Sequence, residues 1–144
     1  MAAVFAAGAT ACSDDNDGGA TNVARSLEVN LDLFEYQIVP DLDAVAAGSV
    51  AFNASNVGDA AHELVIIRTD LAPDALPVGE DGAVDESGEG IAVIGRIGEF
   101  AAQSDASITV DLETGSYVLI CNIVEGDALS HYQEGMYRAF TISE

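Results

Sequence analysis

The sequence predicts an all-β protein, a Greek-key β-sandwich of about seven or eight short strands, from three observations. Apolar and polar residues alternate from Leu27 to Leu31, as in a strand with one buried face. Comparable stretches recur at regular spacing and are separated by turns rich in Gly, Asn, Asp or Pro. The chain has 144 residues, of which 49% are hydrophobic, so it is long enough for one domain with a substantial core.

The first half of the domain is expected to contain three strands followed by a long loop. The alternation of residues 27–38 predicts the first strand, which a proline ends. Apolar residues at 50–52 mark the second strand, and the Asn-Val-Gly-Asp sequence of residues 56–59 predicts a turn. Residues 64–67 are apolar and β-branched, which is typical of a buried strand. Residues 69–90 contain two prolines and many acidic residues, and this composition predicts a long exposed loop.

The second half is expected to contain four strands. Apolar residues in 91–100 predict the first, and 108–112 alternate cleanly before a Glu-Thr-Gly turn. Residues 117–121 place aromatic, Leu and Cys side chains on one face, and 137–142 predict the last strand. The sequence contains no internal repeat.

The N-terminal segment has a different character, so we divide the chain into residues 1–25 and a domain of residues 26–144. Residues 1–12 are small and apolar, end in Cys12 and are followed by acidic residues, which resembles the end of a bacterial lipoprotein signal peptide. On this hypothesis Cys12 is lipidated and residues 13–25 form a flexible acidic tether. The alternative is an alanine-rich leader with an incidental cysteine.

The charge balance excludes several classes of partner. The chain has 25 Asp and Glu, four Arg and no Lys, which gives a formal net charge of −21. Such a surface repels nucleic acid and anionic lipid headgroups, so we expect membrane attachment only through a lipid anchor. No apolar stretch is long enough to span a bilayer. Adaptation to high salt and a GC-rich genome are two alternative explanations for the lack of lysine.

Four residues of scarce types indicate a metal site. Outside the N-terminal segment the chain has one Cys, two His and one Met, namely Cys121, His62, His131 and Met136. One thiolate, two imidazoles and a weak axial thioether form the ligand set of a type 1 copper site. Taken singly, each residue is more often structural, since a lone Cys or Met usually fills apolar space. Residues 26–144 have too few thiols for a Cys₄ or Cys₂His₂ zinc site, and the chain has no phosphate-binding loop.

The order of these residues resembles the cupredoxins, the small blue copper proteins of the plastocyanin, azurin and halocyanin type. The resemblance extends from about Leu27 to Glu144. It is carried by short motifs that occur in the family's order, which are Tyr36-Gln37-Ile38-Val39-Pro40, Val45-Ala46-Ala47-Gly48, Asn56-Val57-Gly58 before His62, Gly115-Ser116-Tyr117 before Cys121, and Gly135-Met136 after His131.

This resemblance implies a cupredoxin fold that binds one copper ion, with His62, Cys121 and His131 as equatorial ligands and Met136 as the axial ligand. The chain departs from small cupredoxins between Cys121 and His131, where residues 124–130 resemble an insertion. A loop of similar length occurs at the type 1 site of copper nitrite reductases. Because His131 lies in this loop, it is expected to be the ligand nearest the surface.

We therefore expect a monomeric electron-transfer protein that is not an enzyme. Its partners would be extracytoplasmic redox proteins or membrane redox complexes. It would be anchored by lipid to the outer face of the cytoplasmic membrane, or be periplasmic or secreted without lipidation. The alternative is an extracytoplasmic copper-binding or delivery protein without redox turnover. A truncated multicopper enzyme would need further His ligands, and the chain has only two His.

Overall fold

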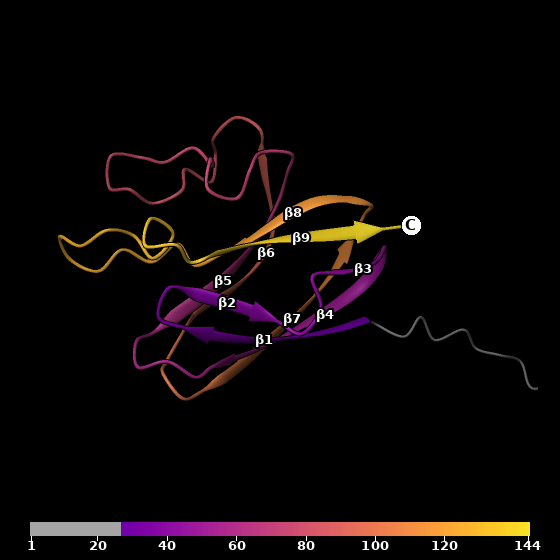
Figure 1. The fold of residues 1–144 in the computed structure, drawn as a ribbon, viewed down its shortest axis with the longest axis horizontal. Coiled ribbons are helices and arrows are strands. Elements are labelled where there is room, and N and C mark those ends of the chain that lie inside the picture. The colour runs from indigo at the N-terminus through magenta and orange to yellow at the C-terminus, as the bar shows by residue number, and fades with distance from the viewer. Residues whose placement is uncertain (1–26) are drawn as a thin grey trace, which may run out of the picture.

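The computed structural model describes residues 27–144, which form two β-sheets packed face to face (Figure 1). The predicted all-β sandwich is confirmed. The nine strands, in chain order, are β1 (Leu27–Phe34), β2 (Gln37–Pro40), β3 (Ala44–Ala46), β4 (Gly48–Asn56), β5 (His62–Thr69), β6 (Ile91–Phe100), β7 (Asp105–Leu112), β8 (Gly115–Ile120) and β9 (Tyr137–Ser143). Within the described residues, no helix has the length and apolar character needed to cross a membrane.

The two sheets combine antiparallel and parallel pairs. One sheet has the strand order β2-β1-β4-β7, and the other has the order β3-β9-β8-β5-β6. The pairs β1–β4 and β3–β9 are parallel, whereas the other neighbouring strands are antiparallel. The segment 27–38, expected as one strand, is divided by a turn in which Tyr36 has a φ of 63°. Together with the short edge strand β3, this division brings the number of strands to nine.

The main core lies between the sheets. Alternate residues of β1, Val29, Leu31 and Leu33, point into it and are at most 1% exposed. Phe52 of β4 and Phe140 of β9 meet edge to face across the core, with ring centroids 5.5 Å apart. Such a pair adds about 0.5–1.5 kcal/mol to the stabilisation from burial alone.

A second apolar cluster covers the outer face of the five-stranded sheet. Val65 and Ile67 of β5 lie on that face and contact Leu76 and Val84 of the long loop, residues 70–90. Leu76 and Val84 are 5% and 4% exposed, so the expectation of a wholly exposed loop is wrong at these positions. Because β5 is covered on both faces, its sequence is a continuous apolar run instead of an alternating one.

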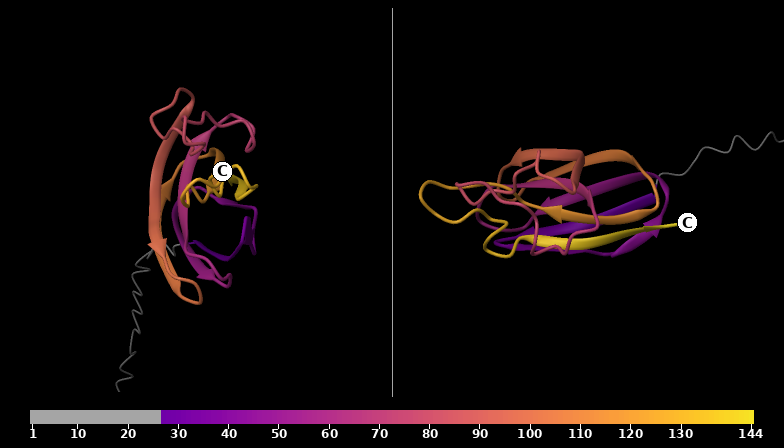
Figure 2. Two further views of the ribbon diagram at one scale, coloured as in Figure 1. Left: turned by 90° about the vertical axis from the view of Figure 1, so that its left-hand side faces the viewer. Right: turned by 90° about the horizontal axis from the view of Figure 1, so that it is seen from above.

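The two long connections lie at one end of the sandwich. Residues 70–90 and residues 121–136 extend from the end at which β1 turns into β2 (Figures 1 and 2). β1 begins and β9 ends at the opposite end (Figures 1 and 2). The residues that carry chemistry are therefore far from both ends of the described chain.

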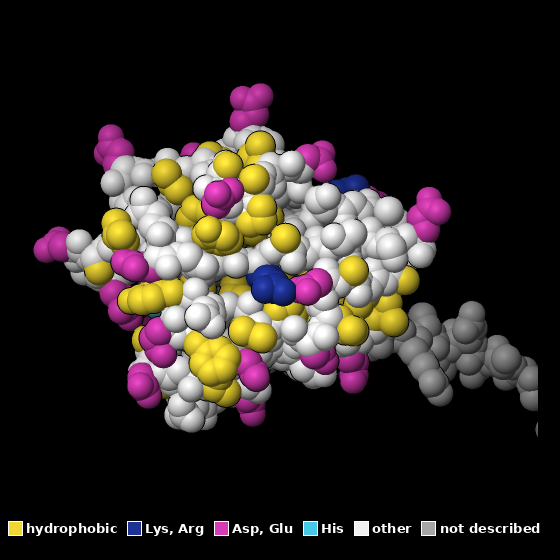
Figure 3. Space-filling model, viewed as in Figure 1, with side chains coloured by type: hydrophobic (Ala, Val, Ile, Leu, Met, Phe, Trp, Pro, Cys, Tyr) yellow, Lys and Arg dark blue, Asp and Glu magenta, His cyan; other side chains and the backbone are white. Residues whose placement is uncertain are grey.

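Carboxylates are spread over the face seen in Figure 3 and are more numerous there than arginines. Each arginine of the described residues is paired with a carboxylate. Arg68 bonds Glu113 at 2.5 Å and Arg138 bonds Asp43 at 2.8 Å, while Arg96 contacts Glu86. No arginine of residues 27–144 is thus left as an isolated positive charge.

Candidate metal centre

His62 is the first residue of β5 and follows a turn that buried polar groups shape. The side chain of Asn56, 1% exposed, accepts a hydrogen bond from the Gly58 amide and donates one to the Ala60 carbonyl. The carboxylate of Glu35, from the β1–β2 turn, accepts bonds from the amides of Asp59 and Ala60. These bonds hold the turn and direct the chain into β5 at His62.

Cys121 directly follows β8, which is the neighbour of β5 in the sheet. The register pairs Val65 with Ile120, so Cys121 lies near the start of β5. Its Sγ is 3.4 Å from the Glu63 amide, which donates to it. The thiol is free and fully buried. Two strands of one sheet therefore bring His62 and Cys121 together.

His131 reaches the same place from the long connection between β8 and β9. Its amide donates to the Ile123 carbonyl at 2.8 Å, and Val124 pairs with Ser130 as an isolated bridge. The predicted insertion, residues 124–130, is thus a small lobe closed at its base. The hydroxyl of Ser130 donates to the Gly82 carbonyl and attaches this base to the other long loop.

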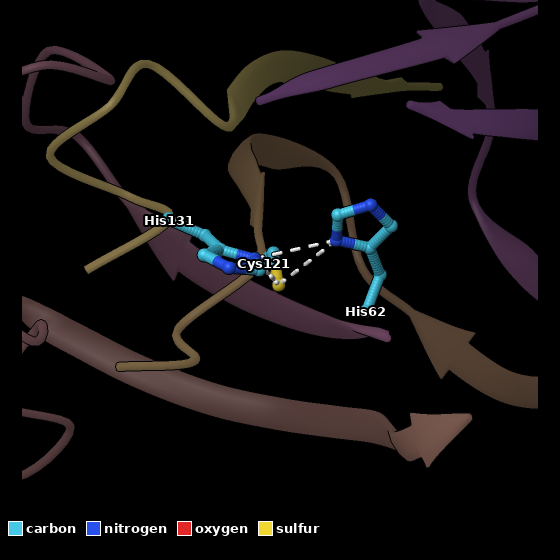
Figure 4. Close-up of side chains that lie close together, drawn as sticks. All are labelled: His62, Cys121 and His131. Carbon is cyan, nitrogen blue, oxygen red and sulfur yellow. Dashed lines mark hydrogen bonds between the residues drawn. The ribbon is translucent and has the colours of Figure 1, made fainter. Parts of the chain in front are cut away.

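The three side chains converge on one point (Figure 4). Nδ1 of His131 lies 3.4 Å from Sγ of Cys121, and Nδ1 of His62 lies 3.9 Å from it. The two Nδ1 atoms are 3.3 Å apart. All three donor atoms lie within 4.8 Å of one another, and the residues are 0–3% exposed. This arrangement could hold one metal ion.

Burial shifts the pKa values of His62 and Cys121. Desolvation lowers the pKa of His62, and the nearby His131 lowers it further, so the His62 imidazole is neutral and offers a lone pair. Desolvation raises the pKa of the Cys121 thiol to about 11. A cation among the three donors would replace the thiol proton and stabilise the thiolate. One sulfur and two imidazole nitrogens are donors that suit copper or zinc better than magnesium or calcium.

Met136 stands directly before β9 and is fully buried in the core cluster that includes Cys121. Its carbonyl accepts a bond from the Cys121 amide at 3.2 Å, and its amide donates to the His131 carbonyl at 2.9 Å. The backbone of Met136 is therefore bonded to two of the three donor residues. The role of its thioether as axial ligand stays a prediction.

His131, expected to be the ligand nearest the surface, is the most exposed of the four candidate ligands, at 3% against 0% for the other three. The ring of Tyr36 packs edge-on against it with centroids 5.4 Å apart. The side chain of Asn122, the residue after Cys121, bonds Val84 and Glu86 of the loop 70–90. Tyr132 and Tyr137 pack against each other.

Sequence reasoning did not identify two carboxylates that lie beside the histidines. Glu35 Oε1 is 3.5 Å from Nε2 of His62, and Glu125 Oε2 is 3.8 Å from Nε2 of His131. Neither glutamate has a local signal, since Glu35 is distant from His62 in sequence and Glu125 stands in an acidic surface segment. Cys12 lies outside the described residues.

The fold has relatives among solved structures. No protein-family model matches the sequence, and no curated protein matches it. The chain is similar to dithionite-reduced auracyanin from the photosynthetic bacterium Roseiflexus castenholzii, with a TM-score of 0.59 and 19% identity over 83% of this chain and 98% of that chain.

Two further solved structures share this likeness. One is the azurin Az-iso2 of the methylotroph Methylomonas sp. strain J, with a TM-score of 0.56 and 13% identity over 83% of this chain and 99% of that chain. The other is auracyanin A, a "blue" copper protein from the green thermophilic photosynthetic bacterium Chloroflexus aurantiacus. Its TM-score is 0.51, with 14% identity over 81% of this chain and 99% of that chain. At these identities, the comparisons establish the fold.

Proposed function

Residues 27–144 have the cupredoxin fold, and on that premise we propose that the chain is an electron-transfer protein with one copper ion. His62, Cys121 and His131 would be the equatorial ligands, and Met136 the axial ligand. The observation that carries the proposal is the convergence of two imidazole nitrogens and one sulfur in a buried place. When bound, copper supplies a one-electron couple between its cuprous and cupric states.

The protein's part is to hold these donors in nearly the same positions in both oxidation states. His62 and Cys121 stand at the ends of paired strands, and the Cys121 sulfur accepts a backbone hydrogen bond. The backbone bonds between Met136 and its neighbours join the third donor, His131, to the start of β9. A site that moves little on electron transfer has a small reorganisation cost, which suits an electron carrier.

Burial also supports an electron carrier over an enzyme. The donors are 0–3% exposed, so a substrate has no direct access to them. An electron, in contrast, can pass through packed side chains. Tyr36 contacts His131 and is 40% exposed, so it offers a route from the centre to the surface.

The proposal is tested by loading the apoprotein with Cu(II) and recording its visible spectrum and voltammogram. We expect an intense thiolate-to-copper charge-transfer band at one copper per chain and a reversible one-electron wave. Copper binding without a reversible wave would favour copper storage or delivery. A protein that shows neither the band nor tight copper binding would refute the proposal.

We also propose that the protein works outside the cytoplasm, anchored through lipid on Cys12, and passes electrons to redox proteins or membrane redox complexes. The composition of residues 1–25 supports this. The described domain begins and ends opposite the candidate centre, so an N-terminal tether would leave that centre facing away from the membrane (Figure 1).

The anchor is tested by Cys12→Ser in a chain produced in bacteria behind a complete signal peptide. We expect the variant to move from the membrane to the soluble fraction with an unchanged copper spectrum. A variant that still sediments with membranes would contradict lipidation. A variant that lost its copper spectrum would instead make Cys12 part of the metal site.

A further inference from the structure

Glu35 links the β1–β2 turn to the start of β5. Its Oε1 accepts hydrogen bonds from the amides of Asp59 and Ala60, at 2.6 and 2.8 Å. The same oxygen lies 3.5 Å from Nε2 of His62. One carboxylate therefore holds the turn before His62 and faces the ring of His62 itself.

Nε2 of His62 needs such a neighbour. It is buried and has no hydrogen-bond partner in the described structure. Glu35 Oε1, at 3.5 Å, lies beside it without forming a hydrogen bond. When Nδ1 of a neutral histidine binds a metal, the ring proton must reside on Nε2. A buried N–H without an acceptor is unfavourable. Glu35 carries the carboxylate oxygen placed beside this nitrogen.

We propose that Glu35 is a positioning residue that accepts the Nε2–H of His62 and forms a carboxylate–histidine–metal arrangement; this inference rests on the proposed copper site. Ligating histidines in proteins commonly use such partners, which fix the ring orientation and raise the basicity of the metal-binding nitrogen.

Gly58 provides the space that this carboxylate occupies. A Cβ atom at position 58 would lie 2.3 Å from Oε1 of Glu35, closer than any real contact. The adjacent Tyr36 has a φ of 63°, which L-residues rarely adopt, and its ring packs against His131. The Glu35–Tyr36 turn thus contacts both imidazoles, one through a carboxylate and the other through an aromatic ring.

The two carboxylates near the histidines are not equivalent. Two backbone amides bind Glu35, and its side chain is 40% exposed. The side chain of Glu125 is 57% exposed and lies 3.8 Å from Nε2 of His131. Because two amides hold the Glu35 carboxylate in place, water screens its charge from the metal less than it screens the charge of Glu125. Glu35 should therefore favour Cu(II) over Cu(I) more than Glu125 does and lower the reduction potential.

The test compares Glu35→Gln with Glu28→Gln. The amide oxygen of Gln can still accept the two backbone bonds, so the turn is retained while the charge is removed. Glu28 is exposed on β1, the strand that precedes the Glu35 turn, and lies roughly 20 Å from it. Glu28→Gln therefore removes the same charge at a distance from the candidate centre. We expect Glu35→Gln to reduce the preference for Cu(II) about tenfold, which raises the potential by about 59 mV. Glu28→Gln should leave the potential near that of the wild type.

NMR of the reduced, diamagnetic protein gives a second measure. The Nε2–H of His62 should exchange slowly in the wild type and faster in Glu35→Gln, because a neutral amide oxygen accepts a weaker hydrogen bond than a carboxylate does. Gly58→Ala displaces the carboxylate without removing it, so it should also raise the reduction potential. This variant provides the test if Glu35→Gln does not fold. If Glu35→Gln and Glu28→Gln have equal potentials in a blue, redox-active protein, the inference fails and the copper site stands. A wild type without the charge-transfer band would overturn both.

Discussion

The candidate centre has two halves that are held differently. His62 and Cys121 stand at the ends of adjacent strands, where the sheet register determines their separation. His131 lies in a connection of sixteen residues, 121–136, and depends on contacts with another loop, 70–90. The sheet fixes the thiol and one imidazole, whereas loop packing fixes the second imidazole. Substitutions in the two halves should therefore have different consequences.

Removing the sulfur should have the largest effect. Cys121→Ser eliminates the thiolate, which is the charge-transfer donor and the softest ligand. We expect complete loss of the intense visible band and of most copper affinity, measured by absorption titration of the apoprotein. A Ser variant as intensely coloured as the wild type would show that the strand-held half is not the metal site.

The loop-held half can be weakened without touching a candidate ligand. The Tyr132 hydroxyl donates to the Pro73 carbonyl at 2.7 Å and accepts from the buried Leu76 amide at 3.0 Å. Tyr132→Phe leaves both groups without that partner, so we expect a loss of about 1–3 kcal/mol in the free energy of unfolding. Urea unfolding of the apoprotein measures this loss of stability.

Tyr137→Phe is the matched control for this change, because Tyr137 packs against Tyr132 and its hydroxyl has no hydrogen bond in the described structure. We expect Tyr137→Phe to lower the free energy of unfolding much less than Tyr132→Phe does. Equal stabilities of the two variants would mean that the contacts between the loops do not support the His131 half.

The sequence predicted more of the fold than of the contacts between its loops. Alternation at Val29, Leu31 and Leu33 identified β1, and the apolar run 64–67 identified a strand covered on both faces. These signals are local, because each side chain reports the face on which it lies. The sequence order of the four candidate ligands also indicated one site, and three of the four converge.

The remaining features depend on residues distant in sequence. The turn at Tyr36 has none of the Gly, Asn or Pro signals, although its φ is 63°, and its ring packs against the distant His131. Burial of Leu76 and Val84 follows from the loop folding back over the sheet, which composition does not reveal. The approach of Glu35 to His62 likewise arises only when two turns meet.

A substitution at the junction of the halves should have a moderate effect. Met136 is bonded through its backbone to both Cys121 and His131, and those bonds do not depend on its side chain. Met136→Leu conserves volume, so we expect a stability loss of about 1 kcal/mol, retained copper and a higher reduction potential. Voltammetry of the copper-loaded variant measures the shift. Complete loss of copper would show that the thioether is needed to hold the metal.

The smallest effect is expected from the exposed carboxylate of the loop half. Glu125→Gln removes a charge 3.8 Å from Nε2 of His131, but water surrounds that glutamate. Its influence on the ratio of Cu(II) to Cu(I) affinity should be on the order of twofold or less. The potential of this variant, measured beside that of Glu35→Gln, sharpens the contrast between the two halves. A larger shift in reduction potential for Glu125→Gln than for Glu35→Gln would contradict this contrast.

The pairing of Arg68, Arg96 and Arg138 with carboxylates has a consequence for encounter rates. An approaching molecule meets a surface on which every described arginine is already neutralised locally, in a chain of net charge −21. Added salt screens this field over a Debye length that falls from about 30 Å at 0.01 M to about 3 Å at 1 M. A cationic partner would then associate more slowly as ionic strength rises, and an anionic partner would associate faster. Whether the association rate falls or rises with ionic strength therefore reports the sign of the partner's charge before its identity is known.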